Sequence, residues 1–299
     1  MSVVAVPKSV PHALLRVLLL LSLVLGSMAA MAAPRVATSI RPLQLIAAAV
    51  MDGVGQPELV LGAGQDPHEI SLRPSERRLL AEADLVLWIG PALEFPLQSI
   101  LALRPEALLT AQTLPGIELL PAGDSVDPHL WLSLANAQVI AAALAERLVA
   151  LDPVQAARYR ENLQRFDTVL AATREDTHAV LAAANPLAWG VYHHALVYLE
   201  HEQGLPAALT ITDSHGNMPG VRALRGTRQM LAERNLGCLL AEPGVDLAKV
   251  RSLLDRPRLD ILTVDILGTD QALAPGGYPA MYETLVAALV ACAKDRDND

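Results

Sequence analysis

The chain has 299 residues, of which 52% are hydrophobic, 3% aromatic and 18% charged. This length suits two domains of roughly 100–150 residues, each able to bury a core of mostly aliphatic side chains. The formal net charge of −9 comes without clusters of basic residues, which argues against nucleic acid or an anionic membrane surface as the partner.

The first 32 residues have the pattern of a secretory signal peptide. Lys8 and Arg16 supply a positive region, and the apolar run at 14–25, about 12 residues, is too short for a bilayer span of ~20. Ala30-Met31-Ala32 is a small-residue cleavage pattern, so we expect cleavage after Ala32 and export of a soluble mature protein. An uncleaved anchor is the alternative. We expect no further membrane span.

Strands and helices alternate at short spacing through residues 33–151. We expect strands at 35–40, 58–61 and 84–89, and helices at 42–50, 75–80, 95–101 and 136–149, with Ser75 as an N-cap. The strand at 84–89 is continuously apolar, which is typical of a strand covered on both faces of a parallel sheet. Residues 114–127 read as a loop. The pattern predicts an α/β lobe.

Residues 152–185 predict one long helix. Asp152 is the expected N-cap, Pro153 takes the first position, and Asn185-Pro186 ends the helix. Residues that are apolar or weakly polar recur with a helical period, namely Leu163, Phe166, Leu170, Thr173, Thr177 and Val180. About 32 residues at 1.5 Å each give ~48 Å, more than the width of one small domain. We therefore predict a strut that joins two lobes.

The alternation of strands and helices restarts in residues 186–299. We expect strands at 187–192, 207–212, 238–241 and 259–264, and helices at 196–199, 221–234, 246–254 and 278–293, with a frayed tail after 294. The two halves share one architecture. The predicted fold is α/β, with two βα lobes joined by one long backbone helix.

Four candidate metal ligands stand at the ends of ordered segments. His68 follows the second strand, His129 follows a rigid Asp-Pro step, and His193 and Asp265 end strands of the second lobe. Ligands of open α/β sheets gather beyond the carboxyl ends of strands, so facing lobes would bring these residues into one cleft. Three imidazole nitrogens and one carboxylate oxygen match a four-coordinate Zn²⁺ site.

Alternatives remain for some of these ligands. His194, next to His193, could bind in its place. Asp265 could instead cap a helix, leaving water or another carboxylate to complete the metal shell. His215 lies in a loop, where it is either solvated or hands metal to the cleft. Trp131 is expected to pack behind His129 and fix its ring. Three more side chains are expected to have no role in metal binding. His178 and His201 are expected on helix surfaces, and Glu242 at a helix cap.

The chain contains two cysteines, Cys238 and Cys292. An even number of cysteines in an exported protein predicts a disulfide, here between the strand near Cys238 and the last helix. It would close a loop of about 54 residues and contribute ~2–4 kcal/mol. Two buried free thiols are the alternative.

Several motifs together resemble the zinc-binding proteins of bacterial metal ABC importers, the cluster A-I family of zinc and manganese solute-binding proteins. They are Asp-Pro-His-x-x-Ser-Leu-Arg-Pro-Ser at 66–75, His-Leu-Trp-Leu-Ser at 129–133, a strand ending at His193, and Asp-x-Leu-Gly at 265–268. The resemblance spans about 35–292 and includes the cysteine pair. It implies a two-lobed fold around a long helix, and a monomer that captures metal in the periplasm and docks on a permease.

The resemblance implies His68, His129 and His193 as ligands, with Asp265 at the position of a fourth, acidic ligand. Members that carry manganese usually have glutamate at the position of His193, so histidine there favours zinc. The His-rich loop of many zinc members is missing, because 119–127 is short and contains no histidine. Manganese or iron remains the first alternative. A zinc hydrolase, for which no His-Glu-x-x-His is present, and an adhesin are further alternatives.

Overall fold

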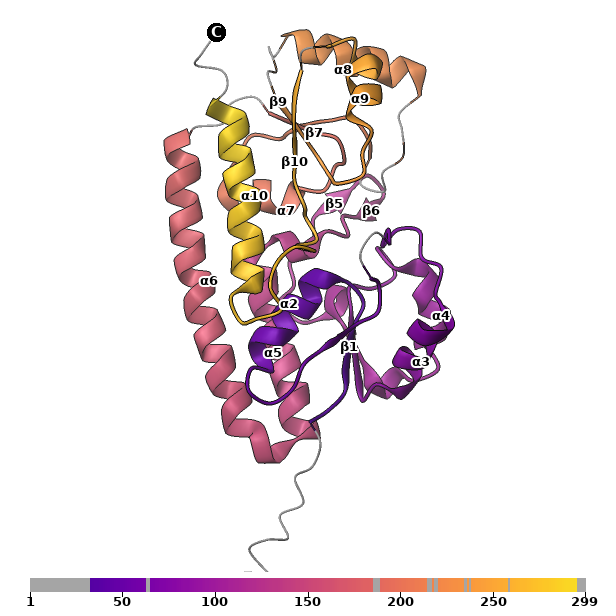
Figure 1. Cartoon of the computed structure of the whole chain (residues 1–299), viewed down its shortest axis with the longest axis vertical. Coiled ribbons are helices and arrows are strands. Elements are labelled where there is room, and N and C mark those ends of the chain that lie inside the picture. Colours follow the sequence, from indigo (N-terminus) through magenta and orange to yellow (C-terminus); the bar gives the residue numbers. More distant parts are fainter. Residues whose placement is uncertain are drawn as a thin grey trace, which may run out of the picture. The chain divides into compact units, whose positions relative to one another are not determined.

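The computed structural model describes residues 33–294, apart from 63–64, 185–188, 214–216, 218–219, 234–235, 237 and 258. Four sequence predictions therefore lie outside the described residues: the signal peptide with its cleavage after Ala32, the end of the long helix at Asn185-Pro186, the role of His215, and the tail beyond 294. Residues Pro34–Asp299 form one compact unit, which contains all the elements below (Figure 1).

The first sheet has four parallel strands in the order β2-β1-β3-β4. They are β1 (Val36–Thr38), β2 (Glu58–Leu59), β3 (Leu85–Trp88) and β4 (Leu108–Thr110). The first three confirm the predicted strands, although each is shorter than expected. The fourth was not predicted, because three residues after a proline turn carry no periodicity. The predicted loop at 114–127 contains a small hairpin, β5 (Pro121–Ala122) with β6 (Ser125–Val126).

The helices of this half are α2 (Arg41–Val50), α3 (Pro74–Glu82), a 3₁₀ turn (Phe95–Leu97) followed by α4 (Gln98–Leu101), and α5 (Leu134–Leu151). The predicted N-cap Ser75 is wrong, because α3 begins one residue earlier with Pro74 and has Arg73 at its N-cap. The Glu76 carboxylate reaches back to accept the Arg73 backbone N–H at 2.6 Å. Proline suits the first helical position because its missing N–H is not needed there.

The second sheet repeats the topology of the first. Its four parallel strands run in the order β10-β9-β7-β8, so in both sheets the first strand of the lobe pairs with the second and the third. The strands are β7 (Gly190–Val191), β8 (Leu209–Thr210), β9 (Cys238–Ala241) and β10 (Asp260–Thr263), with helices α7 (Val197–Gln203), α8 (Val221–Glu233), α9 (Leu247–Leu254) and α10 (Gly277–Lys294). The shared architecture of the two halves is confirmed.

The predicted strut is α6 (Ala156–Ala184), a helix of 29 residues. A 3₁₀ turn, Pro153–Gln155, precedes it with Asp152 at its N-cap. Seven side chains make its buried face: Tyr159, Asn162, Phe166, Leu170, Thr173, Thr177 and Leu181. The prediction for Val180 is wrong, because this side chain is 47% exposed and Leu181 takes the inner place. In Figure 1, α6 runs beside α10 of the second half and α5 of the first.

The helix α5 differs from the expectation of no further membrane span. Among the described residues it is the one helix that is long and apolar enough to cross a bilayer by length and composition. One face of α5 is buried, and the helix packs against α2 and α6. Its Ser133 N-cap accepts the backbone N–H of Asn136, as expected of a helix start. A core helix with mostly alanine and leucine has the same composition as a span.

Candidate metal centre

His68 and His129 lie in similar local turns. In each case the aspartate two residues earlier accepts the histidine backbone N–H, at 2.8 Å from Asp66 and 3.0 Å from Asp127. The proline between them restricts the backbone, so the turn holds the histidine at a defined angle. His68 follows β2 and is partly buried, whereas His129 is 1% exposed.

The ring of His129 is fixed on two sides. Its Nδ1 lies 2.9 Å from Asp127 Oδ1, and because an ionised carboxylate only accepts, Nδ1 carries the proton and Nε2 keeps its lone pair. The Trp131 ring packs against it with centroids 5.2 Å apart, as predicted, and Trp131 Nε1 donates to Ile266 O at 3.0 Å. Burial lowers the pKa of His129 while Asp127 opposes the shift, so the neutral ring is favoured.

His193 lies at the end of β7, where the chain changes the side of the second sheet on which it adds strands. It follows β7, and Glu242 directly follows the neighbouring strand β9, which pairs with β7 through Val191 and Leu240. This is the switch point of an open α/β sheet, where ligands collect. His193 Nδ1 lies 3.2 Å from Glu242 Oε1, and both side chains are largely buried. The carboxylate orients this ring as Asp127 orients the ring of His129.

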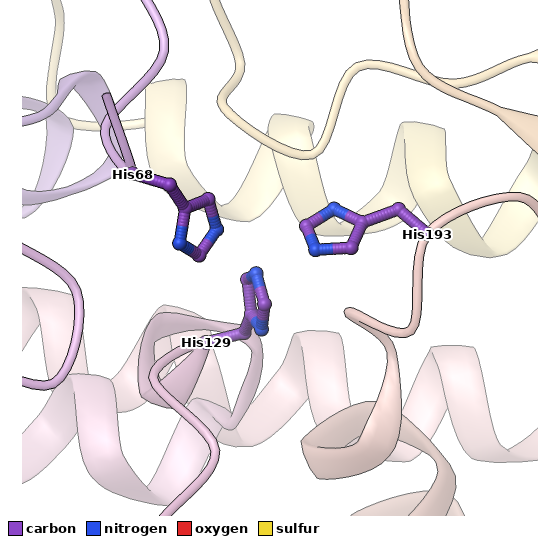
Figure 2. Close-up of side chains that lie close together, drawn as sticks. All are labelled: His68, His129 and His193. Atoms are coloured by element: carbon purple, nitrogen blue, oxygen red, sulfur yellow. The ribbon is translucent and has the colours of Figure 1, made fainter. Parts of the chain in front are cut away.

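The three histidines come together although they belong to three separate loops (Figure 2). One candidate ligand nitrogen from each lies within 4.8 Å of the other two. The ring centroids are 5.5 Å apart for His68 with His129 and with His193, and 4.8 Å for His129 with His193. Nitrogens bound to one tetrahedral Zn²⁺ lie ~3.3 Å apart, given Zn–N bonds of ~2.0 Å. Small movements of the three side chains would bring their nitrogens close enough to bind one metal ion.

Asp265 is not in the group that the three histidines form among the described residues. It follows β10, as expected, but both carboxylate oxygens accept hydrogen bonds within its own loop. Oδ1 accepts the N–H groups of Leu267 and Gly268 at 2.9 and 3.1 Å, and Oδ2 accepts the Thr269 N–H and hydroxyl, each at 2.5 Å. The carboxylate therefore stabilises the turn that contains Ile266, whose carbonyl oxygen accepts the Trp131 Nε1–H.

The other candidates lie elsewhere. His194 is partly buried, which lowers its pKa, and it is not in the histidine group among the described residues. His178 is exposed on α6, and His201 is exposed on α7 with its Nε2 3.0 Å from Glu118 Oε1, so the helix-surface interpretation of both is confirmed.

Two partners of the histidines were missed in the sequence. Asp127 could have been found, because an Asp-x-His step within a buried segment places the carboxylate beside the ring. Glu242 was interpreted as a possible helix cap, since nothing local links it to His193, which lies 49 residues earlier.

The fold defines the class of this protein, a two-lobed α/β solute-binding protein with a long connecting helix. The family model described as zinc-uptake complex component A, periplasmic (ZnuA), matches residues 36–292. The chain belongs to the ZnuA family.

Curated relatives and solved structures agree with this membership. The high-affinity zinc uptake system protein ZnuA of Yersinia pestis is 30% identical over 88% of this chain and 92% of its own length. The ZnuA protein of Haemophilus ducreyi is 29% identical over 86% and 92%. The periplasmic zinc-binding protein TroA of Treponema pallidum superposes with a TM-score of 0.77 at 19% identity, over 87% of this chain and 99% of that one. At that identity the likeness concerns the fold.

Proposed function

We propose that this protein captures Zn²⁺ in the periplasm and delivers it to the membrane permease of an ABC importer. The observation that carries the proposal is the approach of three imidazole nitrogens within 4.8 Å, from His68, His129 and His193. Zinc prefers such nitrogen ligands at four-coordinate sites. Membership of a periplasmic zinc-uptake family, and relatives named for zinc uptake, support the choice of metal and compartment.

The proposed ligand set is His68, His129 and His193, all neutral when they bind. Three neutral imidazoles leave the loaded site at the charge of the ion itself. Asp265 was expected as the fourth ligand, but its four hydrogen bonds would have to break first. They favour water as the fourth ligand. Asp265→Asn is then expected to change zinc affinity less than His129→Ala does.

The proposal includes the organisation expected from the sequence. Residues 1–32 would be a signal peptide cut after Ala32, 33–151 and 186–299 the two lobes, and 152–185 the linking helix. The mature protein would act as a monomer, because one chain supplies all three histidines. It would act as a carrier and not as an enzyme, and metal-dependent hydrolysis lost in His129→Ala would contradict that part.

The decisive experiment measures metal content and metal competition on the purified mature protein. We expect near one zinc per chain, retained in excess Mn²⁺, and lost in His129→Ala. His193→Glu replaces a nitrogen ligand by oxygens and should weaken the preference for zinc over manganese. His178→Ala, on the exposed face of α6, is the matched control and should bind as the wild type does. Zinc readily displaced by Mn²⁺ would assign the protein to manganese or iron instead.

A further inference from the structure

A second site adjoins the histidines. A cavity of about 230 Å³ has Arg41, the first residue of α2, in its wall. Pro67, which immediately precedes His68, lines another side. Most of the remaining wall is apolar, with Leu59, Leu61 and Leu267 among its side chains. One cation in a partly open and mostly apolar cavity is the composition of a pocket for a small amphiphilic anion.

Arg41 is a partly buried cation without an acidic partner. Its Nη1 donates to Gln44 Oε1 at 2.6 Å and its Nη2 to Gln271 O at 2.5 Å, both neutral acceptors. Its Nε is buried without a hydrogen-bond partner, and no carboxylate among the described residues pairs with the guanidinium. Burial lowers the pKa of Arg41, because it removes water from around the charged group. A guanidinium offers five donors, so most of its capacity is unused.

We propose that this cavity binds a small organic carboxylate, with its carboxylate on Arg41 and its carbon skeleton on the leucine wall. The planar fork of arginine matches a carboxylate in two parallel hydrogen bonds. The leucine side chains favour an anion with a carbon skeleton over inorganic phosphate, while Gln65 and Thr269 add polar groups to the same wall. An anion here would give Arg41 the counter-charge that the fold does not supply.

The position of the cavity links this anion to the histidine group. Pro67 holds His68, and Thr269, also in the wall, donates to Asp265. This part rests on the proposed function: a loaded three-histidine site carries the +2 charge of the ion, so metal and anion should each bind more tightly in the presence of the other. The two coupling factors must be equal, because the linkage is reciprocal.

The first test uses thermal unfolding of the metal-free mature protein. Sodium butyrate and sodium acetate are compared with sodium chloride at equal ionic strength. Wild type should gain about 2–4 °C in Tm at ligand concentrations well above Kd, since a ligand that binds only the folded state stabilises it. Arg41→Gln should lose this gain. A wild-type protein with no gain over chloride, or an Arg41→Gln protein that keeps it, would overturn the proposal.

Two further variants control for the loss of a partly buried arginine and for the loss of the guanidinium geometry. Arg147→Gln is the matched control, because Arg147 is also partly buried and also donates to neutral acceptors, Leu108 O and Glu106 O, but is not part of the cavity wall. It should keep the full gain. Arg41→Lys retains the positive charge but lacks the planar guanidinium fork, so it should keep a smaller gain in Tm. This variant still tests the proposal if Arg41→Gln folds poorly. An undiminished gain in Arg41→Lys would contradict the role of the fork.

Further comparisons identify the class of anion and distinguish failure of the anion site from failure of the proposed zinc function. A gain in phosphate equal to that in butyrate would overturn the carboxylate assignment. Zinc is then titrated into the same metal-free samples to measure its stoichiometry. Normal zinc binding with no effect of either carboxylate would reject the anion site and leave the proposed function intact. A carboxylate gain in a protein that binds no zinc would do the reverse.

Discussion

At the scale of single residues, Asp127 holds the proposed ligand His129 in place. Asp127 accepts both the backbone N–H and the Nδ1–H of His129 through one oxygen, while its other oxygen is buried without a hydrogen-bond partner. Asp66 accepts the backbone N–H of His68 in the same local turn. The difference between the two carboxylates is that Asp127 also fixes the ring.

Asp127→Asn should therefore weaken zinc binding by about 10–100-fold, the usual cost of losing a carboxylate that orients a ligating histidine. The amide either donates to Nδ1, which selects the wrong tautomer, or accepts more weakly. Competition with a coloured chelator measures the affinity. Asp66→Asn is the matched control and should cost less. Equal losses in both variants would mean that the ring contact is unimportant.

Glu94 is an acid outside the proposed metal site. It is fully buried; Gly90 N–H donates to its Oε2 at 3.0 Å, and Oε1 has no hydrogen-bond partner. Burial raises its pKa to about 7, while the nearby Ser39 hydroxyl and the backbone N–H groups of Gly90 and Ile89 limit the shift. The folded protein thus holds a proton here that the unfolded chain, with an ordinary pKa near 4.5, releases at lower pH.

Because the folded state binds more protons between pH 4.5 and about 7, stability falls as pH rises through this window. Glu94→Gln, which stays neutral, should match wild type near pH 5 and exceed it by ~1–3 kcal/mol at pH 8. Urea unfolding at both pH values measures the difference. Glu106→Gln, at an exposed carboxylate, keeps Glu94 and should lose stability with rising pH as wild type does. A Glu94→Gln protein less stable than wild type at pH 8 would contradict the argument.

At the scale of elements, one carboxylate joins three helices. Glu202 of α7 accepts the Leu134 and Ala135 N–H groups, at 2.6 and 3.1 Å, at the start of α5. It also pairs with Arg174 of α6 at 3.0 Å, and its side chain is only 11% exposed. A negative charge at a helix N-terminus satisfies unpaired donors and complements the helix dipole. This contact ties α5 and α7 to the long helix.

Glu202→Gln should lower the free energy of unfolding by ~1–2 kcal/mol, because a charged cap becomes neutral and Arg174 loses its ion pair. The urea midpoint provides the measurement. Glu175→Gln, at an exposed position of α6, should leave it within ~0.5 kcal/mol of wild type. No loss in Glu202→Gln would show that a neutral amide oxygen caps α5 as well as the carboxylate does.

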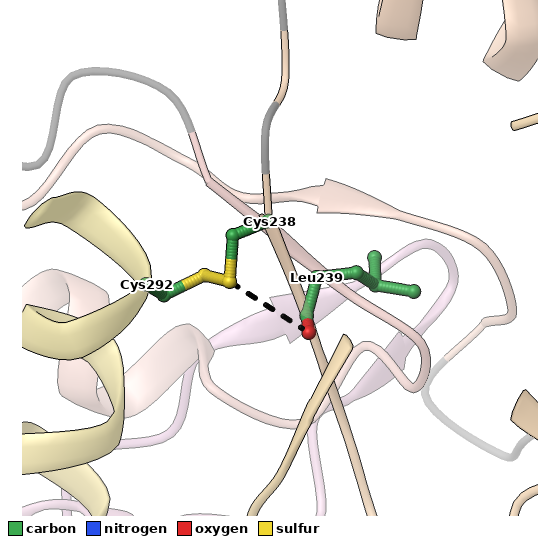
Figure 3. The surroundings of a disulfide bond; sticks show 3 residues. All are labelled: Cys238, Leu239 and Cys292. Atoms are coloured by element: carbon green, nitrogen blue, oxygen red, sulfur yellow. Dashed lines mark hydrogen bonds between the residues drawn. A yellow bond between two sulfur atoms is a disulfide. The ribbon is translucent and has the colours of Figure 1, made fainter. Parts of the chain in front are cut away.

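At the scale of the whole molecule, strand β9 carries the disulfide at one end and adjoins the proposed metal site at the other. Cys238, the first residue of β9, is bonded to Cys292 of α10, with Cα atoms 5.3 Å apart, which confirms the predicted disulfide (Figure 3). Glu242, the partner of His193, follows the other end of the same strand. The bridge therefore anchors the strand at the end away from the histidines.

Replacing both cysteines by serine should cost ~2–4 kcal/mol of stability, because the unfolded chain regains the freedom of a 54-residue loop. The urea midpoint and zinc stoichiometry are measured together. Zinc binding should remain near one per chain at low denaturant, because the bridge is at the far end of β9. Loss of zinc binding in a variant that is still folded would contradict that separation.

Much of the fold follows from the sequence because its signals are local. The alternation of apolar runs and helical periods predicted seven of the eight strands in the two main sheets, the long helix and the shared architecture of the halves. The strand β4 and the hairpin β5–β6 were missed because proline or glycine next to them favours a loop interpretation. Val180 was misplaced because the period of a long helix shifts gradually around its axis.

The sequence by itself determined which residues could bind a metal, because the turns that hold His68 and His129 are built from adjacent residues. Tertiary structure alone decided what each side chain meets. Glu242 reaches His193 only because β9 lies beside β7, and Asp265 bonds to its own loop instead of joining the histidines. Arg41 faces Gln271 across 230 residues. Such pairings depend on strand order and loop packing, which no local pattern encodes.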